Sequence, residues 1–122
     1  MKLSQFELNV IEALIQDDLE EKIIRSQLED AKVTKRDYTG VGLYTEILVQ
    51  KKCSRLSKSN RYIEEIPKAH LEHPELSYGA GAILWFNEGY VSTLECYTYE
   101  GNWPKDESLF NIYINSIIQI KD

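Results

Sequence analysis

The amino-terminal part of the chain repeats apolar positions at helical spacing. Phe6 and Val10 lie four residues apart and, with the apolar residues that follow, give one broad buried face up to about residue 16. The sequence Ser-x-x-Glu from Ser4 to Glu7 matches a capping box, in which each side chain hydrogen-bonds the other residue's backbone N–H. We therefore expect a helix that starts at Ser4.

A second helix is predicted to begin within the polar stretch 17–21. Asp18 can cap this helix, and Glu20 and Glu21 place negative charge in its first turn, where the helix dipole favours it. The apolar positions of this predicted helix are Leu19, Ile23, Ile24, Leu28 and Ala31. The amino-terminal part should therefore form two antiparallel or angled helices.

Later in the chain, apolar residues recur at every second position, which is the period of a strand. Residues 41–50 alternate in this way, and the charged residues 32–38 suit an exposed edge strand beside them. Residues 80–86 and 90–99 are largely apolar on both faces and are separated by a turn at Gly89. We predict that these two strands form a hairpin in the centre of an antiparallel sheet, with the helices over one face.

Shorter strands are predicted on either side of that hairpin. One begins at Tyr62 and ends at Pro67, after a loop at 53–60 that is rich in Ser and Lys. The other covers residues 110–114. Further apolar residues that are expected to complete the core are Ile117, Ile118 and Ile120. Residues 1–122 are thus predicted to be a single α+β domain, with two N-terminal helices packed on an antiparallel β-sheet of about five strands.

The composition is that of an ordinary globular protein, with 43% hydrophobic and 28% charged residues among 122. It holds no run of about 20 apolar residues that could cross a membrane, and Glu7 and Glu12 interrupt any signal peptide. Cys53 and Cys96 are expected to be free thiols, as is usual in reducing compartments. We therefore expect a cytoplasmic protein with no membrane partner.

The net charge of −6 is unevenly distributed. Residues 51–61 hold five basic residues and no acidic one, so the rest of the chain is strongly acidic. An acidic protein has little general affinity for nucleic acid, because phosphate binding depends on lysine and arginine. The basic stretch also lacks the interleaved aromatic residues of a single-strand binder, with only Tyr62 just beyond it. RNA binding by this stretch is thus the least favoured function, and a solvated loop is the preferred interpretation.

The histidines and cysteines of the chain have structural interpretations. His70 and His73 lie three residues apart near Glu72 and Glu75, but further ligands that a zinc site needs are missing, which favours a surface turn. Cys96 has no histidine beside it in sequence and is interpreted as a small core residue. We therefore predict no catalytic residue, no metal site and no cofactor.

Two glycine pairs and two carboxylates leave an enzyme as the alternative function. The segments Gly40-Val41-Gly42 and Gly79-Ala80-Gly81 each open a predicted strand, whereas phosphate-binding loops lead into a helix, so close backbone approach or a bulge explains them better. Glu46 and Glu95 lie in predicted strands, where burial could raise the pKa of a carboxyl group toward a catalytic value. A fold-assembled site of these carboxylates and nearby tyrosines is the alternative, although a solvated or arginine-paired role is preferred for both.

Three stretches of the chain carry a resemblance to a known group of proteins. They are Arg36-Asp-Tyr-Thr-Gly-Val-Gly-Leu-Tyr-Thr45, Gly79-Ala-Gly-Ala-Ile-Leu-Trp-Phe86 and Leu94-Glu-Cys-Tyr-Thr-Tyr99, the last followed by Trp103-Pro104. In this order they resemble a widespread group of small uncharacterised bacterial proteins, in which Arg-Glu-Tyr-Thr-Gly-Val-Gly, Gly-Ala-Gly, Leu-Glu-Gly-Tyr-Thr-Tyr and Trp-Pro are expected. The chain departs from that pattern at Asp37, Leu43 and Cys96, where a glutamate, an aromatic residue and a glycine are expected.

The resemblance implies an immunity protein, a small antidote that binds and neutralises a toxin domain delivered by neighbouring bacteria, including contact-dependent inhibition systems. Many such toxins are basic nucleases, and an acidic partner gains fast encounter and charge complementarity with them. We therefore expect a protein that is monomeric when free and occludes the active site of its cognate toxin without catalysis.

Two groups of residues are predicted to contact that partner. The first is acidic and lies before the second predicted helix: Asp17, Asp18, Glu20 and Glu21. The second mixes an acid with large amphipathic rings, as binding surfaces often do: Glu95, Tyr97, Tyr99 and Trp103.

Overall fold

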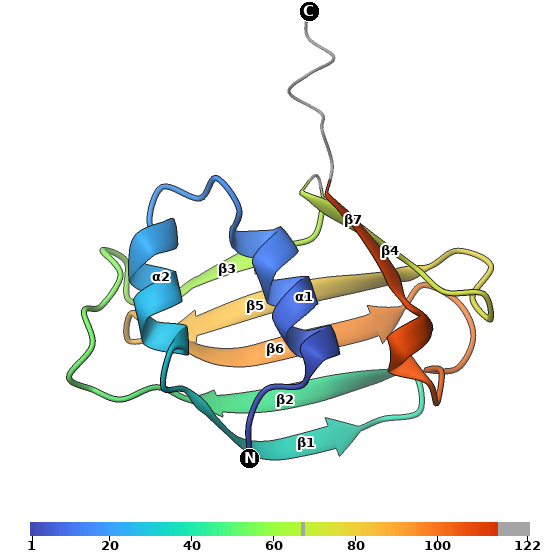
Figure 1. Cartoon of the computed structure of the whole chain (residues 1–122), viewed down its shortest axis with the longest axis horizontal. Coiled ribbons are helices and arrows are strands. Elements are labelled where there is room, and N and C mark those ends of the chain that lie inside the picture. The colour runs from blue at the N-terminus through green and yellow to red at the C-terminus, as the bar shows by residue number, and fades with distance from the viewer. Residues whose placement is uncertain (67, 115–122) are drawn as a thin grey trace, which may run out of the picture.

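The helix nearest the amino terminus, α1 (Gln5–Ile15), begins as the sequence predicts (Figure 1). The Ser4 hydroxyl accepts a hydrogen bond from the N–H of Glu7 at 3.1 Å, and the Glu7 carboxylate accepts the N–H of Ser4 at 2.7 Å. These bonds complete the capping box and satisfy backbone donors that the helix itself leaves unpaired. This computed structural model describes residues 1–66 and 68–114.

The second helix, α2 (Glu21–Leu28), begins later than predicted. Between the helices the chain turns at Asp17, which has a left-handed backbone conformation with φ of 63°. Asp18 accepts the N–H of Glu20 at 2.9 Å and so stabilises this turn instead of capping the helix. Leu19 consequently lies in the turn with its side chain fully exposed, and its assignment to the apolar helix face is wrong.

The described residues contain seven strands in one antiparallel sheet. The strands are β1 (Lys32–Tyr38), β2 (Gly42–Leu48), β3 (Arg61–Glu64), β4 (Ala69–Glu72), β5 (Ala80–Asn87), β6 (Tyr90–Thr98) and β7 (Asn111–Ile114). Their order is β1-β2-β6-β5-β4-β7, and β3 also pairs with β5. The α+β class is confirmed, while the sheet has seven strands instead of about five.

The unpredicted strand is β4, which lies in the segment interpreted above as a surface turn. Ala69 and Leu71 are buried at alternate positions, and the strand pairs with β7 along its length. His73, just after the strand, is also buried, and its Nε2 lies 2.9 Å from the carbonyl oxygen of Asp106. A surface turn is therefore wrong for His73, whereas His70 is exposed on the strand.

The hairpin of β5 and β6 lies in the interior of the sheet, as predicted. Its turn consists of Glu88 and Gly89, which both have positive φ, at 54° and 82°. Two such residues form the turn type whose twist matches that of the flanking strands. The pairing shifts by one residue between Trp85 and Phe86, which is a bulge within the hairpin.

The hydrophobic core lies between the helices and one face of the sheet, and Figure 1 shows both helices on that same side. Val10 and Leu14 of α1 are fully buried, as are Leu84 of β5 and Leu94 of β6. No helix in the described residues is long and apolar enough to cross a membrane. Four residues with predicted roles lie outside the described part of the chain: Pro67, Ile117, Ile118 and Ile120.

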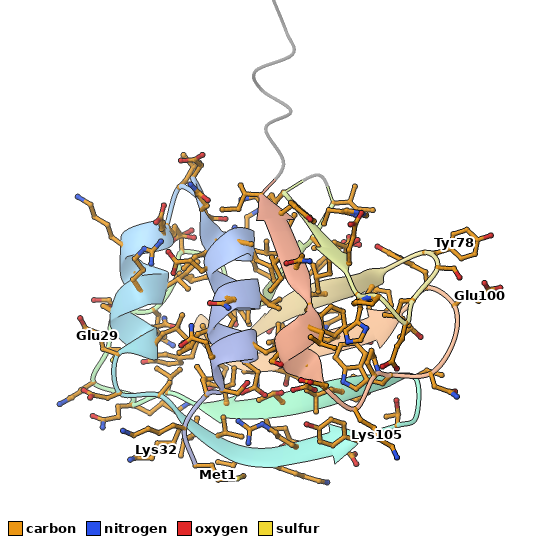
Figure 2. The ribbon with its side chains drawn as sticks, turned by 45° about the vertical axis from the view of Figure 1, so that its right-hand side comes forward. Met1, Glu29, Lys32, Tyr78, Glu100 and Lys105 are labelled. Atoms are coloured by element: carbon orange, nitrogen blue, oxygen red, sulfur yellow. The ribbon has the colours of Figure 1, made fainter. Side chains whose placement is uncertain are left out.

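A buried ion pair joins α1 to the first hairpin. Glu7 accepts hydrogen bonds from Arg36 of β1 at 2.7 and 2.8 Å and from the Thr45 hydroxyl of β2 at 2.6 Å. Burial alone would raise the pKa of Glu7, but these hydrogen bonds outweigh it and hold the pKa below its usual value. The amino terminus also lies against β1 (Figure 2), where the carbonyl of Met1 accepts the N–H of Val33 at 2.8 Å.

Candidate functional site

One face of the sheet is covered by the helices, and the opposite face is not. Successive side chains of a strand point to opposite faces, and in β2 the buried Leu43 and Thr45 face the helices. Tyr44 and Glu46, which alternate with them, therefore lie on the other side and are exposed. This second side, termed here the open face, receives no helix from the described residues (Figure 1).

Cross-strand pairing arranges the open face into two rows that run over β1, β2, β6, β5 and β3. The first row, from β1 to β3, is Asp37, Tyr44, Glu95, Ile83 and Glu64. The second row, in the same strand order, is Lys35, Glu46, Thr93, Trp85 and Tyr62. The face thus combines three large rings with four carboxylates and one lysine.

Glu95 stands at the centre of the open face and is held by two aromatic donors. Its Oε1 accepts the indole N–H of Trp85 at 3.1 Å, and its Oε2 accepts the hydroxyl of Tyr44 at 3.2 Å. The negative charge of Glu95 raises the pKa of Tyr44, so this phenol remains a donor at neutral pH. The ring of Tyr62 lies 5.3 Å from that of Trp85, which extends the aromatic surface onto β3.

Tyr97 and Tyr99 continue the same face around a carboxylate that the sequence did not single out. Glu65 is buried, and it accepts the backbone N–H of Ala82 at 3.0 Å together with the hydroxyl of Tyr99. Burial and the neighbouring Glu65 raise the pKa of Tyr99, which keeps this phenol protonated. The rings of Tyr97 and Tyr99 meet edge to face at 5.8 Å. Of the predicted contact residues, Glu95, Tyr97 and Tyr99 are therefore brought together.

Trp103 lies on the helix side of the sheet, apart from the other members of its predicted group. Its ring packs against Phe6 of α1 at 5.9 Å and against Phe110 at 5.1 Å. Its indole N–H donates to Glu107 at 2.8 Å. Trp103 is thus part of the core boundary, and its placement with Tyr97 and Tyr99 in one surface is wrong. The prediction relied on the nearness of Trp103 to Tyr99 in the sequence, but the chain crosses to the other side of the sheet after β6.

Three of the four side chains in the predicted acidic group before α2 are paired within the protein. Asp18 forms ion pairs with Arg61 and, at 3.9 Å, with Lys68. Burial would raise the pKa of Asp18, but the bond from Arg61 dominates and lowers it. Glu20 also binds Arg61, at 3.2 Å. Arg61 belongs to the basic stretch 51–61, so the acidic turn and the basic stretch partly neutralise each other.

Of the remaining two members of the acidic group, Glu21 is held through its side chain and Asp17 through its backbone N–H. Glu21 pairs with Arg25 at 2.6 Å, and its carboxylate accepts the N–H of Asp17 at 3.1 Å. Arg25 also binds Glu12 of α1. These bonds hold the turn between the helices, which gives the group a structural role that periodicity could not reveal.

The carboxylates proposed for an enzyme lie on the open face. Glu46 and Glu95 occupy adjacent rows on neighbouring strands, as diagonal neighbours. Four open hollows on the described surface are lined by other residues. The described residues also contain no group of three or more His, Cys, Asp or Glu side chains that could hold a metal ion. What this face offers chemically is contact area, ring surfaces and negative charge.

The sequence already contained a signal for the open face. Tyr44 and Glu46 alternate with Leu43 and Thr45, and this alternation of exposed and buried positions is typical of a strand with one solvated side. Trp85 gave no such signal, because β5 is apolar on both faces. Comparison of the chain with models of protein families, with curated proteins and with solved structures gave no match.

Proposed function

We propose that this chain is an immunity protein that binds a bacterial toxin domain with its open face and occludes the toxin's active site. The observation that carries this proposal is the pair of aromatic and acidic rows on a sheet face that no described helix covers. Tyrosine and tryptophan combine a large contact area with hydrogen-bonding groups and are enriched at interface hot spots. On this proposal the protein acts in the cytoplasm as a monomer, with no cofactor and no catalysis.

The charge of the open face favours a basic partner. Its two rows contain four carboxylates, and the single basic residue is Lys35 at the outer strand. None of the carboxylates Glu46, Glu64 and Glu95 forms an ion pair within the described residues. Such a surface attracts and orients a basic protein, as a nuclease toxin would require.

The residues that carry the family resemblance divide into two sets, and this division also supports the proposal. Some maintain the fold: a Cβ atom on Gly42 would lie 2.3 Å from the carbonyl oxygen of Cys96, and one on Gly81 would lie 2.6 Å from the Tyr97 ring. Arg36 holds the buried Glu7. The set that reaches the open face includes Tyr44, Glu95, Tyr97 and Tyr99. This second set forms the centre of the proposed docking surface.

The test is reversal of charge on the open face. A toxin domain encoded beside this gene is co-expressed with the wild-type chain and with the double variant Glu64→Lys plus Glu95→Lys. The matched control is Glu29→Lys plus Asp30→Lys, which reverses two exposed charges just after α2. We expect the open-face variant to bind at least about 100-fold more weakly and to lose protection, because two attractive contacts become repulsive.

Calorimetry gives the dissociation constant, and bacterial growth reports protection. The proposal is wrong if no neighbouring toxin domain binds the chain. It is also wrong if the open-face variant binds and protects as well as the control variant. Circular dichroism of both variants verifies that each is folded.

A further inference from the structure

We propose that Glu95, framed by Tyr44 and Trp85, is the receptor for one arginine side chain of the partner protein. This inference rests on the proposed function, because it names the chemistry at the centre of the same docking face. It gives a function to three residues on adjacent strands whose positions are not explained by burial or core packing. Trp85 keeps 38% of its surface exposed and Tyr44 keeps 40%.

The hydrogen bonds of Glu95 leave the acceptor sites that a guanidinium needs. An ionised carboxylate offers about four lone-pair sites on its two oxygens. Trp85 donates to Oε1 and Tyr44 donates to Oε2, so each oxygen keeps acceptor capacity. Two parallel acceptors, one on each oxygen, match the bidentate fork of arginine, whereas lysine is a point charge with no such fork.

The rings beside Glu95 suit the flat face of the same cation. A guanidinium stacks on tryptophan and tyrosine rings and is attracted to their negative faces. Trp85 lies next to Tyr62, with ring centroids 5.3 Å apart and planes inclined at 41°. The partner's arginine can therefore meet a carboxylate and an aromatic wall at one site. The donors to Glu95 also fix its orientation before binding, which lowers the cost of ordering it.

The protein does not fill this site with a cation of its own. Among the described residues, Glu95 has no ion pair with lysine or arginine within 4.0 Å. Arg25, Arg36 and Arg61 are each bound to other carboxylates. Arg55, on the exposed loop, forms no ion pair among the described residues, so a second copy of the chain could offer it as the occupant, and the test below includes that outcome.

The experiment titrates the protein with a short blocked peptide, Gly-Arg-Gly, and follows the two tryptophan indole N–H signals by NMR. The Trp85 indole donates to Glu95 on the open face, whereas the Trp103 indole donates to Glu107 on the helix side. We expect a saturable shift of the Trp85 signal with a dissociation constant on the order of tens of millimolar, because an exposed ion pair and one ring contact are each weak, and no shift for Trp103. A peptide with citrulline, the neutral isostere of arginine, should give no saturable shift.

Three variants locate the site. Glu95→Gln removes the charge and should weaken peptide binding about ten-fold, the size of effect expected when a charge-assisted hydrogen bond becomes neutral. Glu64→Gln, the matched control, removes a carboxylate of the same row two strands away and should leave it nearly unchanged. Trp85→Phe removes the indole donor and should weaken binding less than Glu95→Gln. For Trp85→Phe the Tyr44 and Glu95 backbone signals report binding instead.

The outcomes separate this inference from the proposed function. The arginine site is overturned if the citrulline peptide shifts the Trp85 signal as much as the arginine peptide does. It is also overturned if Glu95→Gln and Glu64→Gln weaken binding of both peptide and toxin equally. In either case the proposed docking face is unaffected. A Trp85 signal that moves with protein concentration and stops moving in Arg55→Gln shows a second copy as the occupant, and it also overturns the inference. If the peptide binds as expected but no toxin domain does, the proposed function is wrong and the arginine site remains.

Discussion

At the residue scale, the buried Glu7 shows how one side chain can serve several elements at once. It closes the capping box at Ser4, pairs with Arg36 of β1 and accepts the hydroxyl of Thr45 of β2. Its side chain is almost fully buried, whereas that of Arg36 is partly exposed. Because a charge in the interior is costly without its partners, this network fixes where α1 sits on the sheet.

We predict that Glu7→Gln lowers the free energy of unfolding by about 3 kcal/mol at neutral pH, since it leaves Arg36 and Thr45 without their charged acceptor. The folded-state pKa of Glu7 is below its ordinary value of 4.5. Its stabilising contribution is therefore complete above that value and is lost as the pH falls through the folded-state pKa. The difference in the free energy of unfolding between wild type and Glu7→Gln should thus be smaller at about pH 3 than at neutral pH.

Urea unfolding followed by circular dichroism at both pH values measures this difference. Glu29→Gln, an exposed carboxylate after α2, is the control and should change stability by less than about 0.5 kcal/mol. If the free energy of unfolding differed between Glu7→Gln and wild type by the same amount at both pH values, the lost stability would be due to packing and not to the charge of Glu7.

Single residues also show where sequence patterns fail. Leu19 fits the helical repeat of Ile23 and Ile24, yet it is exposed, because the local hydrogen bonds of Asp18 place the helix start after it. Periodicity reports what a helix could bury, and not where the chain begins to turn. By contrast, the capping box at Ser4 predicted the start of α1 correctly, because it names hydrogen bonds and not only apolar spacing.

At the element scale, Arg61 connects the turn between the helices to the start of β3. It binds Asp18 and Glu20, and the N–H of Ser57 also donates to Glu20 at 2.8 Å. The turn therefore depends on a loop about 40 residues away in the sequence, a contact of the kind that local patterns do not encode. This explains why the acidic residues looked available for a partner when judged from the sequence alone.

We predict that Arg61→Gln releases this turn. The backbone amides of residues 18–21 should exchange with deuterium at least about five-fold faster, because their local opening becomes easier by roughly 1 kcal/mol or more. The control is Lys58→Gln, which removes a charge beside the same residues without a recorded ion pair among the described residues. Hydrogen exchange with mass spectrometry measures both variants. Unchanged exchange in Arg61→Gln would mean that the turn holds itself through its own backbone bonds.

The strands differ in how far the sequence could predict them. β5 and β6 are long and apolar, and their turn at Gly89 is a recognisable signal, so the hairpin was predicted correctly. β4 has only four residues, and its alternation of Ala69 and Leu71 with polar residues is too short to stand out beside Pro74. Its existence depends on pairing with β7, which is a non-local condition.

At the scale of the whole molecule, the two sides of the sheet have different roles. One side buries the core with both helices, and the other presents the rows around Glu95. The class of the fold could be predicted because it follows from the order of helical and strand periods. The composition of the candidate site could be predicted only in part, because apolar strands such as β5 do not reveal which face the helices leave open. Trp85 and Trp103 illustrate this limit, since similar rings ended on opposite sides.

This arrangement predicts one cooperative unfolding transition, because α1, α2 and the central strands contribute to a single buried cluster. Trp85 reports the open face and Trp103 reports the boundary with α1, so their fluorescence monitors two distant parts of the molecule. In urea, the far-ultraviolet circular dichroism and the tryptophan fluorescence of Trp85→Phe, in which only Trp103 remains, should show coincident transitions. The common slope should be about 1–2 kcal/mol per molar, as for small domains. If Trp103 changed at a lower urea concentration than the backbone signal, the segment after β6 would unfold separately and the single-domain interpretation would fail.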